Sequence, residues 1–213
     1  MRIKERVRII HHPSTQEIFT CIASMPQWSR LLFQQRPHKP YNDFLKWLIN
    51  TNFLKEKNER ITIKMMAAGF KGDATKVTKW IHAIYDDILE LNDEQPQLFQ
   101  TAGIPVSLTM KYDDNYCYVN SSLPVLPREY ESFRFPFVKA KMGIEHFWVK
   151  NVSQMIEADT TQITISLYGG ELNRFREFAL DKALFQGWIH FMDIYQKHPL
   201  EIDKELQDLN RHT

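Results

Sequence analysis

Few side chains of this chain stand at spacings that support metal binding or catalysis. His11 and His12 are adjacent, but a zinc site needs further ligands at a useful spacing, and their neighbours supply none. Glu145 and His146 pair an acid with a base, yet adjacent residues of the strand expected there point to opposite faces. Cys117 lies between two tyrosines, and the sequence places no histidine or aspartate beside it. The sequence therefore predicts no metal site, no cofactor and no catalytic residue.

Positive charge is concentrated in the first part of the chain. Residues 1–85 hold 15 Lys and Arg against 6 Asp and Glu, whereas residues 86–213 hold 12 against 20. The whole chain has a net charge of only +1, so the total conceals two segments of opposite sign. Such asymmetry is typical of proteins with a nucleic-acid or membrane partner. We expect no membrane partner, because the apolar stretches are shorter than the roughly 18 residues that a span requires.

Two short helices joined by a tight turn are predicted over residues 61–85, within the basic segment. Thr62 can cap a first helix that reaches Ala68, because its hydroxyl can accept a hydrogen bond from a free backbone N–H. Asp73 can cap a second helix that continues to about Leu89 in the same way.

The spacing of small and apolar residues in this segment resembles the bacterial helix-turn-helix and winged-helix family of DNA-binding proteins. Ala67 can lie where the two helices cross, Val77 follows ten positions later, and Trp80 three positions after that. The segment departs from the family at the turn, where Lys71 precedes Gly72 although the family usually places glycine first. Gly72 can still supply a left-handed residue there. The resemblance implies that the second helix enters the major groove of DNA.

The outer face of the second helix carries the residues expected to contact DNA. With Lys71 from the turn, they are Thr75, Lys76, Thr78, Lys79 and His82. Lysine and threonine suit contacts to phosphates and simple contacts to base edges. Asp86 and Asp87, one turn beyond, repel phosphate and limit how deeply the helix can lie. The alternatives are a solvated helix of an ordinary three-helix core and a winged helix that binds protein.

The predicted fold class is α+β, in two domains. The boundary is expected within residues 91–100, which are polar, contain Pro96 and lie where the charge changes sign. Residues 1–95 form a basic helical domain with the helix-turn-helix candidate. Residues 96–213 form an acidic domain, in which a long helix covers an antiparallel sheet.

The elements of the first domain begin with a strand or a basic arm. Residues 2–11 alternate basic and apolar side chains, which favours either a strand with one wet face or an arm along the DNA backbone. Residues 16–23 are expected to pair with them. Helices are predicted over residues 26–35 and over residues 43–52, the latter capped by Asn42.

The second domain shows strand patterns followed by helical ones. A hairpin is predicted from residues 105–112 and 115–121, with Asp113 and Asp114 in its turn. Further strands are expected over residues 131–141, 144–152 and 162–168, a long helix over residues 171–197 and a short acidic helix over residues 200–210. The strand aromatics are either core or a stacking platform for single strands, and their alternation favours core: Tyr130, Phe133, Phe135, Phe137, Phe147 and Trp148.

The function expected from these features is non-enzymatic binding of double-stranded DNA. The chain is interpreted as a transcription regulator or as a replication or mobile-element accessory factor, which forms a homodimer through its C-terminal domain. Cys21 and Cys117 are far apart and no signal peptide precedes them, which indicates reduced thiols in a cytoplasmic protein. The alternatives are a protein–protein interaction module that uses a winged-helix-like domain and an enzyme with a site in the C-terminal sheet.

Overall fold

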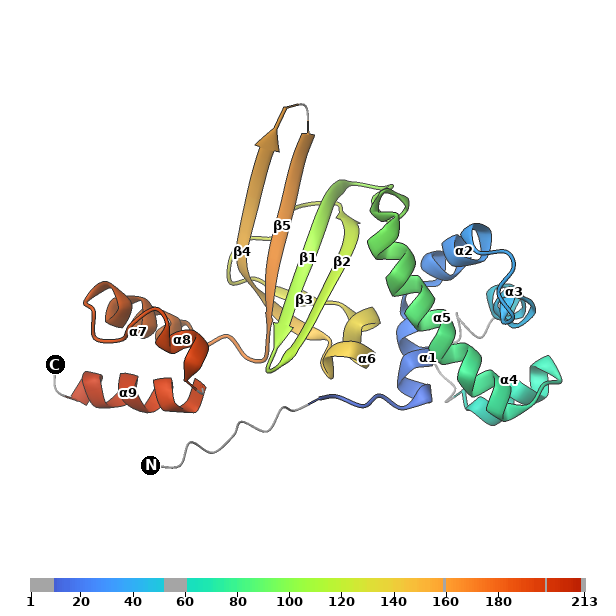
Figure 1. Ribbon diagram of the computed structural model, residues 1–213, viewed down its shortest axis with the longest axis horizontal. Coiled ribbons are helices and arrows are strands. Elements are labelled where there is room, and N and C mark those ends of the chain that lie inside the picture. Colours follow the sequence, from blue (N-terminus) through green and yellow to red (C-terminus); the bar gives the residue numbers. More distant parts are fainter. Residues whose placement is uncertain (1–9, 52–60, 159, 198, 212–213) are drawn as a thin grey trace. The chain divides into compact units, whose positions relative to one another are not determined.

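Helices form the first part of the chain in the computed structural model, which describes residues 10–51, 61–158, 160–197 and 199–211. They are α1 (Thr15–Ser24), α2 (Pro26–Gln35), α3 (Asn42–Asn50), α4 (Ile63–Phe70) and α5 (Ala74–Glu94), followed by a short 3-10 turn, η2 (Pro96–Leu98) (Figure 1). The helix predicted over residues 26–35 is confirmed, with Pro26 in its first turn. Residues 2–9 of the predicted strand or arm lie outside the described residues.

The strand predicted over residues 16–23 is wrong, because α1 occupies this position. The Ser14 hydroxyl accepts a hydrogen bond from the N–H of Glu17 and caps the helix. The buried residues of α1 follow the three- and four-residue spacing of a helix and not the alternation of a strand: Ile18, Phe19, Cys21 and Ile22.

The strands form one five-stranded mixed sheet. They are β1 (Ile104–Tyr112), β2 (Asn115–Leu123), β3 (Ser132–Arg134), β4 (His146–Glu157) and β5 (Thr160–Gly169), in the order β2-β1-β5-β4-β3. The predicted hairpin is confirmed, since Tyr112 pairs with Asn115 on either side of Asp113 and Asp114. The prediction of a purely antiparallel sheet is wrong, because β1 and β5 run parallel.

Proline shortens the strand that was predicted over residues 131–141. β3 ends at Arg134, and Pro136 begins a 3-10 turn, η3 (Pro136–Val138), which leads into the short helix α6 (Lys139–Met142). The proline ring restricts φ to the range that a 3-10 turn uses, and Pro136 is the first residue of η3, so the chain turns here.

One hydrophobic core joins the helices up to α6 with one face of the sheet. Leu108 of β1 and Val119 of β2 contribute from that face, and Ile84 and Ile88 contribute from α5. The described residues up to Gly170 form one compact unit around this core. The predicted boundary between residues 95 and 96 falls inside that unit.

The end of α5 lies against the edge strand β2 (Figure 1). The Asn92 side chain accepts a hydrogen bond from the N–H of Asn120 over 2.7 Å and donates one to its carbonyl over 2.8 Å. Both residues are buried. The amide therefore occupies the place of a neighbouring strand and satisfies backbone groups that an edge would otherwise leave open.

The described residues from Glu171 onwards form a second compact unit. It contains α7 (Arg174–Phe185), α8 (Asp193–Gln196) and α9 (Pro199–Arg211), with a small core of its own. The long helix predicted over residues 171–197 is wrong, because α7 stops at Phe185 and Gly187 adopts a left-handed φ of 72°. The acidic helix predicted over residues 200–210 is confirmed as α9.

Candidate nucleic-acid interface

The two helices predicted within residues 61–85 are present as α4 and α5. The Thr62 side chain accepts a hydrogen bond from the N–H of Met65, which caps α4 as predicted. The Asp73 carboxylate accepts one from the N–H of Lys76 over 3.3 Å and caps α5. Both caps are therefore confirmed. They could be predicted because each joins residues only three positions apart.

The turn between the helices differs from the prediction in the residue that becomes left-handed. Lys71 has a φ of 56°, whereas Gly72 does not have a positive φ. The N–H of Lys71 donates to the carbonyl of Ala68, and the N–H of Gly72 donates to the carbonyl of Ala67. This pair of hydrogen bonds is the Schellman motif at the end of a helix. In this motif the left-handed residue directly precedes the residue whose N–H bonds to a carbonyl five positions earlier.

Close packing explains why glycine follows the left-handed residue. A Cβ atom at Gly72 would lie 3.0 Å from Cδ1 of Phe70. Phe70 in turn packs edge-on against Phe44 of α3 and Trp80 of α5, with ring centroids 5.3 and 5.9 Å apart. This contact would be tighter than usual, so glycine at residue 72 lets Phe70 pack without displacement, while Lys71 occupies the left-handed position at a cost of about 1 kcal/mol.

The predicted contact residues divide into an exposed group and a half-buried pair. Lys71, Thr75, Lys76 and Lys79 are exposed, and we call these four residues the lysine surface. Thr78 and His82 are half-buried. The Nε2 atom of His82 lies 3.1 Å from the Thr15 hydroxyl of α1, so this side chain supports the packing of α1 on α5. The structure therefore brings four of the six predicted residues together on one exposed surface.

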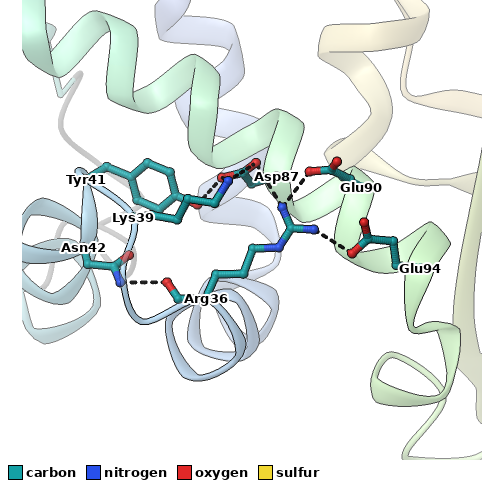
Figure 2. A network of polar contacts seen from close by, with 7 residues as sticks. All are labelled: Arg36, Lys39, Tyr41, Asn42, Asp87, Glu90 and Glu94. Atoms are coloured by element: carbon teal, nitrogen blue, oxygen red, sulfur yellow. Dashed lines mark hydrogen bonds and ion pairs between the residues drawn. The ribbon is translucent and has the colours of Figure 1, made fainter.

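The opposite end of α5 carries three carboxylates that form ion pairs with a single arginine. Figure 2 shows Arg36, just after α2, pointing at three acidic side chains of α5. Its Nη1 atom lies 3.2 Å from Asp87 and 2.6 Å from Glu90, and its Nη2 atom lies 2.7 Å from Glu94. The arginine side chain is 16% exposed. These contacts form the acidic clamp, which holds α2 against α5.

The segment between α2 and α3 completes the acidic clamp. Lys39 Nζ lies 3.0 Å from the Asp87 carboxylate, and the Tyr41 hydroxyl donates to the same carboxylate (Figure 2). Asn42 was predicted to cap α3, but it is the first residue of that helix and its amide donates to the Arg36 carbonyl over 2.7 Å. The prediction is corrected because this amide serves the connection to α2 instead.

Titration of the two neighbouring aspartates of α5 differs because only one belongs to the acidic clamp. Burial favours a higher pKa for Asp87, but hydrogen bonds from Tyr41 and Lys39 and the charges of Lys39 and Arg36 outweigh it and lower the pKa. Burial raises the pKa of Asp86, and the charge of His82 only partly offsets that effect. Asp87, which was expected to repel phosphate, therefore has its charge neutralised within the protein.

Arg36 could not be identified from the sequence, because its carboxylate partners lie 51 to 58 positions further along the chain. Its local context, next to Pro37, indicates only an interruption of the helix. The spacing of Asp87, Glu90 and Glu94 was a usable signal, since these residues share one side of a helix and like charges need a cation nearby.

The two cysteines are buried in the structure. Burial raises the pKa of both Cys21 and Cys117 to about 11, so neither thiol is ready to act as a nucleophile. Within the described ranges, no group of three or more His, Cys, Asp or Glu side chains could hold a metal ion. His11 lies 3.2 Å from Glu17.

Glu145 and His146 were expected to point apart, and this expectation is wrong. The His146 Nε2 atom lies 3.5 Å from Glu145 Oε1. Glu145 precedes the first residue of β4, so strand alternation does not apply to it. The same carboxylate oxygen accepts two hydrogen bonds from Arg134, at 2.9 and 2.7 Å, so the three side chains form a cluster of polar contacts.

Comparisons of the chain with protein-family models, with characterised proteins and with solved structures find no match. Among the described residues, no helix combines the length and apolarity needed to cross a membrane.

Proposed function

We propose that this chain is a non-enzymatic protein that binds double-stranded DNA through the lysine surface of α4 and α5. The arrangement of charge along α5 is the observation that supports this function. Lys76 and Lys79 lie near the positive N-terminal end of the helix dipole, and Glu90 and Glu94 lie near its negative C-terminal end. This order is the reverse of the one that stabilises a helix, so helix stability does not account for it.

The charged side chains at the two ends of α5 differ in whether the protein supplies ion-pair partners for them. At the C-terminal end, Arg36 and Lys39 neutralise the carboxylates of the acidic clamp. At the N-terminal end, no described carboxylate forms an ion pair with Lys71, Lys76 or Lys79. An external polyanion would provide the missing negative charge, and the phosphates of a DNA backbone fit a convex helical surface of this kind.

The chemistry of the lysine surface favours phosphate contacts over the reading of bases. Lysine and threonine bind phosphate oxygens, whereas strong discrimination between bases uses bidentate Arg, Asn or Gln side chains. None of these three residue types stands on the predicted contact face of α5. We therefore infer that affinity depends strongly on salt and that the contribution of base contacts to specificity is small.

We also propose that two chains pair through residues 171–213, because three lysines supply few phosphate contacts for a single chain. This unit exposes large apolar side chains, with Phe185 92% and Phe175 72% exposed. A symmetric dimer would cover such side chains and double the number of phosphate contacts. Sedimentation of the full chain across a range of concentrations tests this pairing.

The role of a transcription regulator or of a replication or mobile-element accessory factor remains our proposal for such a protein, with the cytoplasm as its compartment. The buried free thiols of Cys21 and Cys117 are consistent with a reducing compartment.

Fluorescence anisotropy with a labelled random-sequence duplex, at low and at high salt, tests the DNA-binding proposal. The variant K76E/K79E should lose more than a hundredfold in affinity at low salt, because two attractive contacts become repulsive. The matched control is R30E/K141E, which changes the net charge equally at two exposed cations on α2 and α6. It should bind as the unmodified chain does.

Two results would overturn the proposal. One is the absence of duplex binding by the folded, unmodified chain at low salt. The other is equal binding by K76E/K79E and the control variant, which would exclude the lysine surface. Binding of a protein partner that resists high salt and is lost in K76E/K79E would favour the protein-interaction alternative.

A further inference from the structure

A row of side chains crosses the face of the sheet that turns away from the hydrophobic core. Lys111 of β1 lies opposite Tyr116 of β2 on one side and Tyr168 of β5 on the other. Trp148 of β4 lies opposite Tyr168. Tyr130 stacks beside Trp148, with ring centroids 6.3 Å apart and ring planes inclined by 22°. We call these five residues the aromatic row.

Strand alternation assigns the aromatic row to the outer face of the sheet. Leu108 and Val119 face the core. Lys111 lies three positions after Leu108 and Tyr116 three positions before Val119, and such odd separations place both on the opposite face. Phe147 belongs to the core, whereas its neighbour Trp148 does not. Of the strand aromatics considered from the sequence, the row therefore takes Tyr130 and Trp148 and leaves the phenylalanines elsewhere.

The aromatic row is open to solvent over most of its length. Tyr116 is 62% exposed, and Tyr130 and Tyr168 are each 37% exposed. Trp148, at 7%, is covered by its neighbours within the row, including Tyr168 at a centroid distance of 5.5 Å. The three exposed tyrosine rings are therefore available to contact a ligand or a partner.

Cations accompany the rings of the aromatic row. Lys111 Nζ lies 5.5 Å from the Tyr116 ring centroid and 5.9 Å from that of Tyr168. Lys150, in the bulge of β4, lies 5.7 Å from the Trp148 ring. A lysine between two aromatic rings can form an ion pair with a phosphate while the rings stack on the adjoining bases.

Carboxylates are nearly absent from the strands that carry Lys111, Tyr116, Trp148 and Tyr168, whereas Tyr130, which precedes β3, stands between the exposed Glu129 and Glu131. Within the described strands β1 to β5, Glu157 is the one acidic residue, and it lies at the far end of β4, opposite Thr160. Asp113 and Asp114 stand in the hairpin turn, beyond the last pair of β1 and β2. The positions next to the aromatic row carry hydroxyl groups, among them Thr109 and Ser166.

From this juxtaposition we infer that the outer face of the sheet binds single-stranded nucleic acid. Unpaired bases stack on the exposed tyrosine rings, which Trp148 supports from beneath, and the backbone phosphates pair with Lys111 and Lys150. A duplex cannot use this surface in the same way, because its bases already stack on one another. The inference is independent of duplex binding by α4 and α5, since it concerns other residues and another ligand.

The test uses the full chain and two labelled twelve-residue probes, oligo(dT) and oligo(U). The variant Y116A/Y168A should weaken binding of the tighter probe at least tenfold, because two stacking contacts with bases are lost. Y116F/Y168F keeps the rings without their hydroxyl groups and should bind nearly as the unmodified chain does. The ratio of the two probe affinities identifies whether DNA or RNA is the preferred ligand.

Two crossed measurements separate this inference from the proposed function. Y116A/Y168A should bind the duplex as tightly as the unmodified chain does. K76E/K79E should lose less affinity for the single strand than it loses for the duplex. Circular dichroism and thermal unfolding verify that each variant is folded, which is expected because Tyr116 and Tyr168 lie outside the core.

Three outcomes would overturn the inference. The first is that the folded, unmodified chain binds neither probe at low salt. The second is that Y116A/Y168A binds as well as the unmodified chain, and the third is that Y116F/Y168F binds as weakly as the alanine variant. If neither probe binds and Y116A/Y168A converts a dimer into a monomer, the surface serves a second copy of the chain instead.

Discussion

The two ends of α5 carry opposite charges but use them differently. Near the N-terminal end, Lys76 and Lys79 are exposed and have no ion pair with a described carboxylate. Near the C-terminal end, Arg36 binds Glu90 and Glu94 at 2.6 and 2.7 Å. Both arrangements oppose the helix dipole. The carboxylates stabilise the fold, because the chain supplies their cationic partner. The lysines have no such partner among the described residues and are available to bind an external anion.

The comparison also explains why the sign of the charge changes near residue 86 without a domain boundary. The change lies within α5, a single helix whose buried residues extend from Val77 to Asn92. The buried pairing of Asn92 with Asn120 then joins the acidic end to the sheet. If the comparison is correct, substitutions at the acidic end should alter stability and substitutions at the basic end should alter binding.

The largest effect on stability is expected for Asn92→Ala. The substitution leaves the buried N–H and carbonyl of Asn120 without their hydrogen bonds, and this should lower the free energy of unfolding by about 3 kcal/mol. Denaturant unfolding measures the loss. Asp93→Ala, at the exposed neighbouring position, is the control and should change stability by less than about 0.5 kcal/mol. Equal losses in the two variants would contradict the role given to Asn92.

Arg36→Ala should lower the free energy of unfolding by about 2 kcal/mol, because it leaves Asp87 half-buried with less compensation. Glu90 and Glu94 contribute less, since each is more than half exposed. Arg30→Ala, on the exposed side of α2, is the matched control. The folded Arg36→Ala variant should still bind duplex DNA, and a loss of binding beyond that of the control would remove the distinction between the two ends.

Lys79→Ala should reduce duplex affinity and lower the slope of log affinity against log salt by about 1, while the free energy of unfolding stays within about 0.5 kcal/mol. Anisotropy titrations at several salt concentrations measure the slope. An unchanged slope would show that this lysine makes no phosphate contact.

Lys76→Glu should separate stability from binding most clearly. Lys76 is the third residue of α5, where glutamate can complete a capping box with Asp73 and favour the helix dipole. The free energy of unfolding should therefore rise by about 0.5 kcal/mol while duplex affinity falls. Chemical unfolding and anisotropy on the same sample measure both quantities. A variant that is destabilised and binds normally would contradict the interpretation of this end of the helix.

The smallest expected effect is on the pH dependence of the free energy of unfolding. Because the pKa of Asp87 is lowered in the folded protein, its stabilising contribution is complete above the ordinary value of 3.8 and is lost as the pH falls through the folded pKa. The pKa of Asp86 is raised, so its contribution has the opposite sign and stability increases as that group is protonated. Unfolding curves of Asp87→Asn and Asp86→Asn between pH 3 and pH 7 should therefore deviate from the unmodified chain in opposite directions.

Local signals in the sequence were sufficient for several elements. The caps at Thr62 and Asp73, the helix that starts at Pro26 and the hairpin around Asp113 each depend on contacts between residues a few positions apart. The exposure of Lys76 and Lys79 followed from helical periodicity once α5 was predicted.

Other features were decided by tertiary structure, because they depend on partners far away in the sequence. The parallel pairing of β1 with β5, the acidic clamp of Arg36 and the register that aligns Tyr116 with Lys111 and Tyr168 join distant segments. Lys71, and not Gly72, is the left-handed residue, and Gly72 lies close to the Phe70 ring. The sequence by itself therefore determined the caps, the hairpin and the lysines of α5, whereas sheet order, ion pairing and the aromatic row arose only when long-range packing fixed which segments meet.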